Sequence, residues 1–489
     1  MFDFVKLQLT DKFSYKYLTG TQLLYTMNMM KILLKDIKDR FPEFEILNYD
    51  DSAYFTGFSY DTRSEIVGTI YIPIVGENFD GHSFIKTALE DGATCSFCEN
   101  SKSNFASDCN KPIILVDSIQ EGLEKVLNYA TSFIDKPIVA ITGSTGKTTT
   151  KRMLVHILKS EKNVLWSDHS NTVWGNAVLL SKYDNHDVIV LECAMDRKGE
   201  IAWHVNSVDP DIGVLLNIGF VHAEKIGSIE DIYAEKKDLA DYMRRSGKPL
   251  VLNIDDEMLK RIYDVYTKDY PLVTYGKDQK ADFKIGDINI DKDGTHFKFT
   301  YYEDNILNVD LKVYGQGFAY DAMAAIIVAN MLGISMEKCI SGISTYESSE
   351  ARFEKLEYGE NLVIINDGYN ANPSSMMMAV ETFCKLYKEE YHTIVVLGDM
   401  KELGYVCPSK HKEIGEVVKK CGFDEVYYIG DYYNEFGVGE KVESADEVAA
   451  LLNSRLSELH NRKIAILLKA SNVLNLYKVP DYLKKLGAI

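Results

Sequence analysis

The segment ITGSTGKTTTK, residues 141–151, decides the fold of this chain. It follows the apolar run PIVAI, which is typical of a buried parallel strand, and it leads into a helical segment. Gly143 and Gly146 permit a tight turn whose backbone amides can face phosphate oxygens, and a helix N-terminus favours the same negative charge. Lys147 adds an ammonium group, and Thr148 adds a hydroxyl that suits magnesium. The segment therefore predicts a phosphate-binding loop.

One position departs from the usual phosphate-loop pattern, because Ile141 stands where that pattern has a glycine. The alternative interpretation is a glycine turn that merely precedes a helix, but the preceding strand and the GKTTT run favour the loop. The residues of this segment that are predicted to contact ATP are Gly143, Ser144, Thr145, Gly146, Lys147, Thr148 and Thr149.

Apolar runs that alternate with helix-length segments follow the loop. NVLW, DVIVLECA, DIGVLLNI and KPLVLNI predict a central, doubly wound α/β domain. Residues 281–315 alternate with period two, which predicts an antiparallel hairpin inserted into or appended to that domain. After Arg352, the runs LVIINDG, TIVVLGD, EVYYIG and AILLKAS predict a smaller, Rossmann-like α/β domain whose site lies at the carboxyl ends of its strands.

The first part of the chain is less regular. A helix is expected at residues 22–40, short strands with a helix between them at residues 66–116, and another helix at residues 118–133. A length of 489 residues agrees with about three domains at roughly 100–200 residues each. We therefore predict an α/β protein with three domains, at residues 1–118, 119–348 and 349–489.

The composition argues against some functions. A net charge of −19 disfavours a nucleic-acid backbone as partner, although a local basic pocket can still hold an anionic substrate. The N-terminus lacks the basic and apolar regions of a signal peptide. The longest apolar stretch, residues 322–334, is too short to span a bilayer and predicts a buried helix. We expect a cytoplasmic protein without a membrane span.

The eight cysteines are scattered and do not form a disulfide framework. Cys95 and Cys98 form one C-x-x-C, with Cys109 downstream, but no second pair completes a zinc site. The surrounding GATCSF alternates like a strand, so we expect a buried strand here rather than a metal or redox centre.

Two polar residues follow strands at the sheet edge that carries the loop. Glu192 ends DVIVLE, and His222 follows DIGVLLNI in the string NIGFVHAE. A carboxylate and an imidazole at the carboxyl ends of parallel strands suit magnesium coordination beside ATP. Each residue alone is more often a capping or solvated side chain, so their joint placement is what supports the prediction.

These strings together resemble the Mur ligase family. TGSTGKTTTK, ECAMDRKGEI, NIGFVHAEKIGSIEDIYAEKK and NIDD occur in the family's order and spacing. YDTRSEIVGTIYIPIVGENFDGHSFI, INDGYNANPSSM, LGDMKELG and the more distant LLKASN resemble the branch that adds D-alanyl-D-alanine to UDP-N-acetylmuramoyl-tripeptide. The resemblance runs from residue 58 to the end. It implies a three-domain amide ligase of peptidoglycan synthesis that uses ATP and Mg²⁺.

The resemblance also implies roles for individual residues. Lys147 would bind the ATP phosphates and act in catalysis, and Thr148, Glu192 and His222 would hold magnesium. Lys236 falls where the family has a lysine that is often carbamylated. Unmodified it would repel the metal, a solvated helix lysine is the alternative, and the adjacent Lys237 leaves the register open.

Further residues would bind the substrates. Arg352 and the catalytic Asp367 would reach from the C-terminal domain towards the phosphates and the incoming amine. An arginine in the N-terminal pocket suits a diphosphate, whereas FDGH without the family is merely a turn capped into a helix. The residues implied to bind the UDP-N-acetylmuramoyl-peptide or its dipeptide or amino-acid acceptor are Asp61, Thr62, Arg63, Asp80, Gly81, His82, Asn171, Thr172, Arg197, Asn370 and Asn372.

Several positions depart from the family pattern. The family has G-x-H-N-x-x-N close to the adenine, where this chain has GQGFAYD with Gly317, Phe318 and Asp321. The catalytic centre is intact, but nucleotide preference and acceptor identity stay open. The other departures are Thr172, Ala194, Asn366, Ala470 and Asn472.

Three functions remain for a chain of this kind, which we expect to be a monomer. The first is the ligation of D-alanyl-D-alanine to UDP-N-acetylmuramoyl-tripeptide through an acyl phosphate, and we favour it. The second is a similar ligase that joins another carboxylate and amine outside the usual wall pathway. The third is a nucleotide-binding scaffold without turnover, and the intact catalytic positions argue against it.

Overall fold

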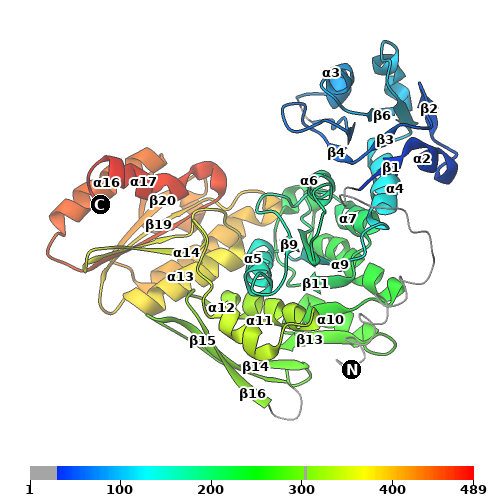
Figure 1. Ribbon diagram of the computed structural model, residues 1–489. Helices are drawn as coiled ribbons and strands as arrows, with labels where there is room; N and C mark the ends of the chain where they lie inside the picture. Colours follow the sequence, from blue (N-terminus) through cyan, green and yellow to red (C-terminus); the bar gives the residue numbers. More distant parts are fainter. Residues whose placement is uncertain (1–29, 77, 302–304) are drawn as a thin grey trace.

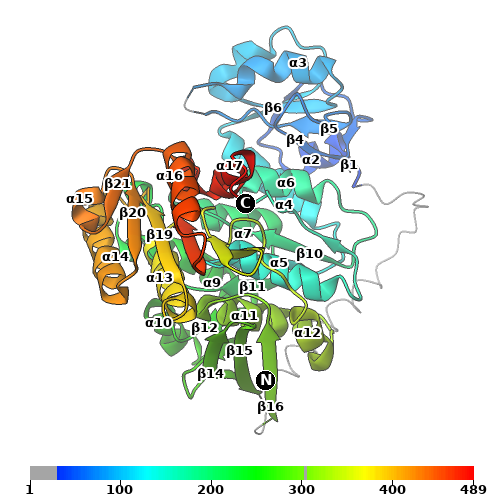
Figure 2. The ribbon, with the colours of Figure 1, turned by 90° about the vertical axis from the view of Figure 1, so that its left-hand side faces the viewer.

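The computed structural model describes residues 30–76, 78–301 and 305–489, which form three α/β units (Figure 1). Figures 1 and 2 show the N-terminal unit, in blue, on one side of the green central unit, and the orange and red C-terminal unit against another side. Each unit has its own sheet. The prediction of a three-domain α/β protein is therefore confirmed.

The N-terminal unit contains a five-stranded sheet in the order β2-β7-β6-β5-β4 and a separate β1–β3 pair. Strands β4 to β7 pair in parallel, and β2 pairs antiparallel with β7. The elements are β1 (Ile32–Leu33), α2 (Leu34–Arg40), β2 (Glu45–Leu47), β3 (Tyr54–Phe55), β4 (Gly57–Ser59), β5 (Thr69–Tyr71), η1 (Gly81–Phe84), α3 (Ile85–Glu90), β6 (Cys95–Glu99), η2 (Asn100–Ala106) and β7 (Ile113–Val116).

The helix predicted at residues 22–40 is shorter than expected within the described residues. It begins at Leu34, because the two preceding residues pair with β3 and bury Ile32. Residues 22–29 lie outside the described part of the chain. The helix predicted at residues 118–133 is present as α4 (Ile119–Thr131), with Ser118 as its N-cap.

The central unit has a nine-stranded sheet in the order β16-β15-β14-β13-β12-β11-β8-β10-β9. The strands from β9 to β14 pair in parallel, whereas β14, β15 and β16 form an antiparallel extension. The predicted hairpin is therefore continuous with the sheet. The strands are β8 (Ile138–Thr142), β9 (Val164–Leu165), β10 (Val188–Glu192), β11 (Ile212–Leu215), β12 (Leu250–Asn253), β13 (Leu272–Gly276), β14 (Phe283–Asp291), β15 (Gly294–Tyr301) and β16 (Asn305–Leu311).

Helices cover this sheet, and α11 packs against α5 beside the phosphate loop. Most of the apolar stretch at residues 322–334 lies in the buried helix α11, which ends at Met331, and no helix in the described residues could span a membrane. The helices are α5 (Lys147–Leu158), α6 (Val173–Leu180), α7 (Glu200–Val208), α8 (Ala223–Ile226), α9 (Ile229–Ser246), α10 (Glu257–Tyr266), α11 (Gln316–Met331) and α12 (Met336–Ile343).

The C-terminal unit has a six-stranded sheet in the order β17-β18-β22-β19-β20-β21, parallel except for the edge strand β17. The four predicted strands are β18, β19, β20 and β22. The elements are β17 (Glu354–Tyr358), β18 (Leu362–Asn366), α13 (Pro373–Tyr387), β19 (His392–Gly398), η3 (Gly404–Val406), α14 (Cys407–Cys421), β20 (Glu425–Ile429), α15 (Tyr433–Phe436), β21 (Glu440–Val442), α16 (Ala445–Glu458), β22 (Ile464–Lys469), η4 (Asn472–Leu474), η5 (Leu476–Lys478) and α17 (Val479–Lys485).

Apolar cores join neighbouring units. One core runs from α5 and α11 into α13 and β19, and so links the central and C-terminal units. Another joins β6 and α4 to α6 and α7, and the Ser181 hydroxyl accepts a hydrogen bond from the Phe58 amide at 2.8 Å. Cys95 and Cys98 are buried thiols in β6, and the described residues contain no group of three His, Cys, Asp or Glu that could hold a metal.

Candidate active site

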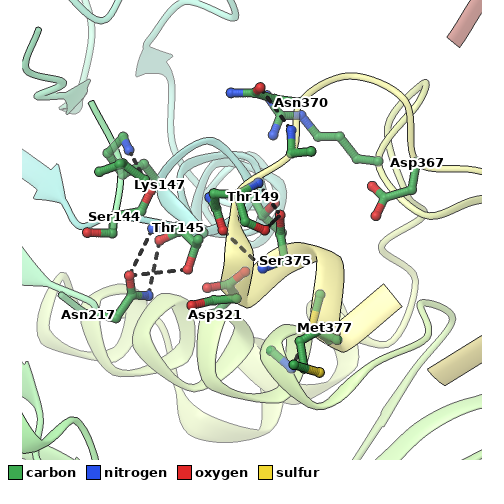
Figure 3. Close-up of a pocket in the computed structure, with 18 of the residues that line it drawn as sticks. Ser144, Thr145, Lys147, Thr149, Asn217, Asp321, Asp367, Asn370, Ser375 and Met377 are labelled. Carbon is green, nitrogen blue, oxygen red and sulfur yellow. Dashed lines mark hydrogen bonds between the residues drawn. The ribbon is translucent and has the colours of Figure 1, made fainter. Parts of the chain in front are cut away.

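The predicted phosphate loop connects β8 to α5. Gly146 caps the helix with φ = +81°, and a Cβ atom there would lie 2.2 Å from Oδ1 of Asp321, so only glycine fits. The Thr145 amide donates a hydrogen bond to Oδ1 of Asn217 at 2.8 Å (Figure 3). The hydroxyl of Ser144 likewise donates to the Gly219 carbonyl at 2.9 Å. The loop is thus held against the end of β11.

The Lys147 ammonium folds back over this loop. Its Nζ donates to the Gly143 carbonyl at 2.8 Å and to the Ser144 carbonyl at 3.3 Å. Burial lowers the pKa of Lys147, although the Glu192 carboxylate opposes that change. A polyphosphate seated on the loop amides would lie beside this ammonium group and stabilise its charged form.

Glu192 lies beside the loop and is almost fully buried, with 3% of its surface exposed. Its carboxylate accepts a hydrogen bond from the Thr148 hydroxyl at 3.0 Å and pairs with Lys151 at 2.9 Å. Burial would raise the pKa of Glu192, but the ammonium groups of Lys151 and Lys147 outweigh it and lower that pKa. The carboxylate is therefore ionised and next to the predicted metal-binding hydroxyl.

Lys236 is buried on α9, with 1% of its surface exposed, whereas Lys237 pairs with Asp241 at 2.6 Å nearer the surface. Burial, with a further contribution from the Lys147 charge, holds the pKa of Lys236 well below its ordinary value. A neutral amine is the form that reacts with carbon dioxide. Of the two lysines between which the sequence could not choose, Lys236 is therefore the one that faces the interior.

The C-terminal unit presents a second charged group to the loop. Lys469 pairs with the Asp367 carboxylate at 2.7 Å and donates to the Asn370 carbonyl at 3.0 Å. Burial raises the pKa of Asp367 despite the Lys469 charge. The Arg352 guanidinium stacks on the Tyr369 ring, 4.1 Å from its centroid. Asp367 and Arg352 both line the same cavity as the phosphate loop.

A cavity of about 1160 Å³ lies between the central and C-terminal units. Figure 3 shows Ser144, Thr145 and Lys147 of the loop on one side of it, and Asp367 and Met377 on the other. The predicted site residues that line it are Ser144, Thr145, Gly146, Lys147, Thr148, Thr149, Asn171, Glu192, His222, Arg352, Asp367, Asn370 and Asn372. Asn372 also caps α13 by accepting from the Ser375 amide at 3.0 Å.

The remaining predicted substrate residues lie elsewhere in the described chain. Arg63 is exposed and forms a bidentate pair with Asp61, at 2.9 and 2.8 Å. His82 is buried, contacts Asp80 at 2.7 Å and accepts from the Glu99 amide at 3.2 Å, so it supports the turn. Thr62 follows Asp61 in the same exposed turn, and Gly81 lies where a Cβ atom would collide with Ile74.

Near the central unit, Thr172 caps α6 and Arg197 faces the Trp203 ring at 6.0 Å. The sequence interpretation did not single out Lys151, Asn217 or Lys469. Lys151 follows Lys147 by one helical turn and could have been found from that spacing. Asn217 and Lys469 become partners of the site only through long-range packing.

This geometry defines a nucleotide-binding site between two α/β domains, and comparisons with known proteins agree. Residues 141–329 match the Mur ligase middle domain, and residues 351–472 match the glutamate ligase domain of Mur ligases. The UDP-N-acetylmuramoyl-tripeptide–D-alanyl-D-alanine ligase of Bacillus subtilis is 32% identical over 377 residues, which is 76% of this chain and 80% of that protein. The ligase of the same name from Escherichia coli is 25% identical, covering 87% and 93%.

Solved structures agree as well. MurF from Thermotoga maritima, in complex with ADP, has a TM-score of 0.76 and 26% identity, covering 88% of this chain and 97% of that one. A crystal structure of MurF from Acinetobacter baumannii has a TM-score of 0.81, with 94% and 99% covered; at 20% identity it supports the fold alone. The chain belongs to the Mur ligase family. The predicted class, an ATP-dependent ligase, is thereby confirmed.

Proposed function

We propose that the protein ligates D-alanyl-D-alanine to UDP-N-acetylmuramoyl-tripeptide, in the cytoplasm and as a monomer. The observation that supports this most is that the phosphate loop lines one cavity together with Arg352 and Asp367 of the C-terminal domain. An amide ligase needs such a site, because the acyl phosphate made beside ATP must meet the amine before water does. The relatives that carry this activity in their names align over most of the chain.

The residues around the loop suit magnesium. The Thr148 hydroxyl and the Glu192 carboxylate are oxygen donors 3.0 Å apart, and Mg²⁺ takes its other ligands from phosphates and water. His222 and a carbamate on Lys236 would complete the set, since a carbamate replaces a cation by an anion. When bound, the metal would neutralise charge on the transferred phosphoryl group.

The chain's own groups then have distinct tasks in the proposed reaction. Lys147 binds the outer phosphates while an oxygen of the substrate carboxylate attacks the γ-phosphorus and ADP leaves. The amine attacks the acyl carbon, and phosphate departs with that carboxylate oxygen. In this proposal Asp367, whose pKa is raised by burial, accepts the proton that the amine must lose.

Phosphate release measured with substrates omitted one at a time tests the proposal. Release from ATP should require both UDP-N-acetylmuramoyl-tripeptide and D-alanyl-D-alanine, and mass spectrometry should detect the pentapeptide product. Background release with both substrates present would reject this substrate pair. A screen of other carboxylates and amines would then separate a different ligase from a scaffold.

A further inference from the structure

Two segments meet across the interface between the central and C-terminal domains. We call them the interdomain latch: residues 220–226, around the start of α8, and residues 402–404, between β19 and η3. The Glu224 amide donates to the Glu402 carbonyl at 3.2 Å. A Cβ atom on Gly404 would lie 3.1 Å from Cα of Glu224, so the two backbones are in close contact. The latch is thus a packed contact between domains.

Side chains in the latch bring a C-terminal carboxylate to His222. Nδ1 of His222 lies 2.7 Å from Oε2 of Glu402 and 3.5 Å from Oδ1 of Asp196, which belongs to its own domain. Asp196 already pairs with Lys225 at 2.5 Å. Glu402 is therefore the carboxylate nearer to Nδ1 of His222, and the other carboxylate, Asp196, is already paired with a lysine.

Glu402 is the hydrogen-bond partner within reach of this ring nitrogen. Nδ1 of His222 is buried, and Oε2 of Glu402 lies 2.7 Å from it. Leaving a buried polar nitrogen unpaired costs free energy, so removal of the Glu402 carboxylate would leave this ring atom without its nearest acceptor.

The backbone on both sides of this contact has an unusual conformation. His222 has φ = +51° and Glu402 has φ = +65°, and neither residue is glycine. Such left-handed conformations cost free energy and persist where surrounding contacts hold them, often at functional sites. The two strained residues face each other across the domain boundary. Their pairing therefore points to a role in the site rather than to chance proximity.

We propose that Glu402 is a positioning residue of the central active site and acts through His222. When the domains are docked, its carboxylate accepts a hydrogen bond from Nδ1–H, which fixes the tautomer whose Nε2 lone pair is available to the cavity that His222 lines. When the domains separate, the carboxylate leaves with the C-terminal domain. The site is thus complete only when the acceptor-binding domain is in place. The inference rests on the proposed function, because it assigns the C-terminal domain to the amine.

A double-mutant cycle tests this role. Glu402→Ala should lower kcat by about 10–100-fold, the usual effect of losing a residue that orients a ligating histidine, with little change in KM for ATP. The double variant Glu402→Ala/His222→Ala should be no slower than His222→Ala, because Glu402 acts through that ring. Glu402→Gln should fall between wild type and alanine, since its amide oxygen can still accept a hydrogen bond.

Glu224→Gln is the matched control, because it removes an exposed carboxylate two residues from His222 and keeps the backbone contact. It should behave like wild type. Fully additive losses in the cycle, or an equal loss in the control, would overturn the proposal.

Small-angle scattering with a non-hydrolysable ATP analogue needs no peptide substrate. Wild type and Glu224→Gln should contract on binding the analogue, and Glu402→Ala should contract less. If wild type has no turnover with the wall substrates, the scattering comparison alone tests the role of Glu402. Equal contraction in wild type and Glu402→Ala would then reject the latch, whatever becomes of the substrate assignment.

Discussion

Replacement of Asp321 should change the free energy of unfolding by an amount that can be worked out from the burial of its carboxyl group. Its carboxyl group is buried on α11 against Gly146, where it accepts a hydrogen bond from the Thr150 hydroxyl at 3.2 Å. Burial raises the pKa of Asp321 from 3.8 to about 8. The variant Asp321→Asn should therefore remove an ionisable group that the fold disfavours in its charged form.

The sign of the effect follows from proton binding. Below pH 3.8 the carboxyl is protonated in both the folded and unfolded states, so it adds no pH dependence. Between pH 3.8 and about 8 the unfolded chain releases the proton and the folded chain keeps it, so the free energy of unfolding declines as pH rises. At 1.36 kcal/mol for each pKa unit, the full cost is about 6 kcal/mol at pH 8.

The assay is thermal unfolding of wild type and Asp321→Asn at pH 5 and pH 8. The variant should be the more stable protein at both values, and its advantage should grow with pH. A gain of several kcal/mol corresponds to roughly 10 °C in Tm for a domain of this size. Asp287→Asn, at an exposed position on β14, should show no such trend. An advantage that is constant or shrinks with rising pH would refute the burial argument.

Three further predictions concern the same domain. Lys147→Ala should lower kcat at least about 100-fold while circular dichroism stays unchanged, because the ammonium group binds the phosphates and not the core; retained ligation would remove the assigned ATP site. Carbon-13 bicarbonate should give a carbamate NMR signal in wild type and in Lys237→Ala but not in Lys236→Ala, and a signal in all three would point to another lysine. Burial lowers the pKa of His204 from 6.5 to about 4, so unfolding measurements should find up to about 3 kcal/mol of stability lost as pH falls from 6.5 to 4. His204→Gln should lose that dependence, and an unchanged slope would assign it to other groups.

The parts of the fold that the sequence predicted are those encoded locally. The phosphate loop has its strand, glycines and helix within a dozen residues, and strands such as β10 and β18 are continuous apolar runs. The placement of Glu192 at the loop followed from the parallel sheet, because carboxyl ends of its strands share one edge. The start of α2 was misjudged, since pairing of β1 with β3 overrides the local helical pattern.

The contacts that the sequence could not reveal join residues far apart in the chain. Asp321 contacts Gly146, which is 175 positions earlier in the chain. Lys469 at the end of β22 pairs with Asp367, which follows β18. The choice between Lys236 and Lys237 depended on which face of α9 is buried. The approach of Glu402 to His222 depends on how two domains dock. None of these relations leaves a periodic signal in the sequence.

The central claim is that this chain makes an amide bond through an acyl phosphate on UDP-N-acetylmuramoyl-tripeptide. The most direct test supplies that substrate with oxygen-18 in the reacting carboxylate, together with ATP and D-alanyl-D-alanine, and analyses both products by mass spectrometry. We expect a pentapeptide and, for each one formed, a single labelled oxygen in the released phosphate. Pentapeptide formed with unlabelled phosphate would contradict the acyl-phosphate route, and phosphate released without pentapeptide would contradict the assigned ligation.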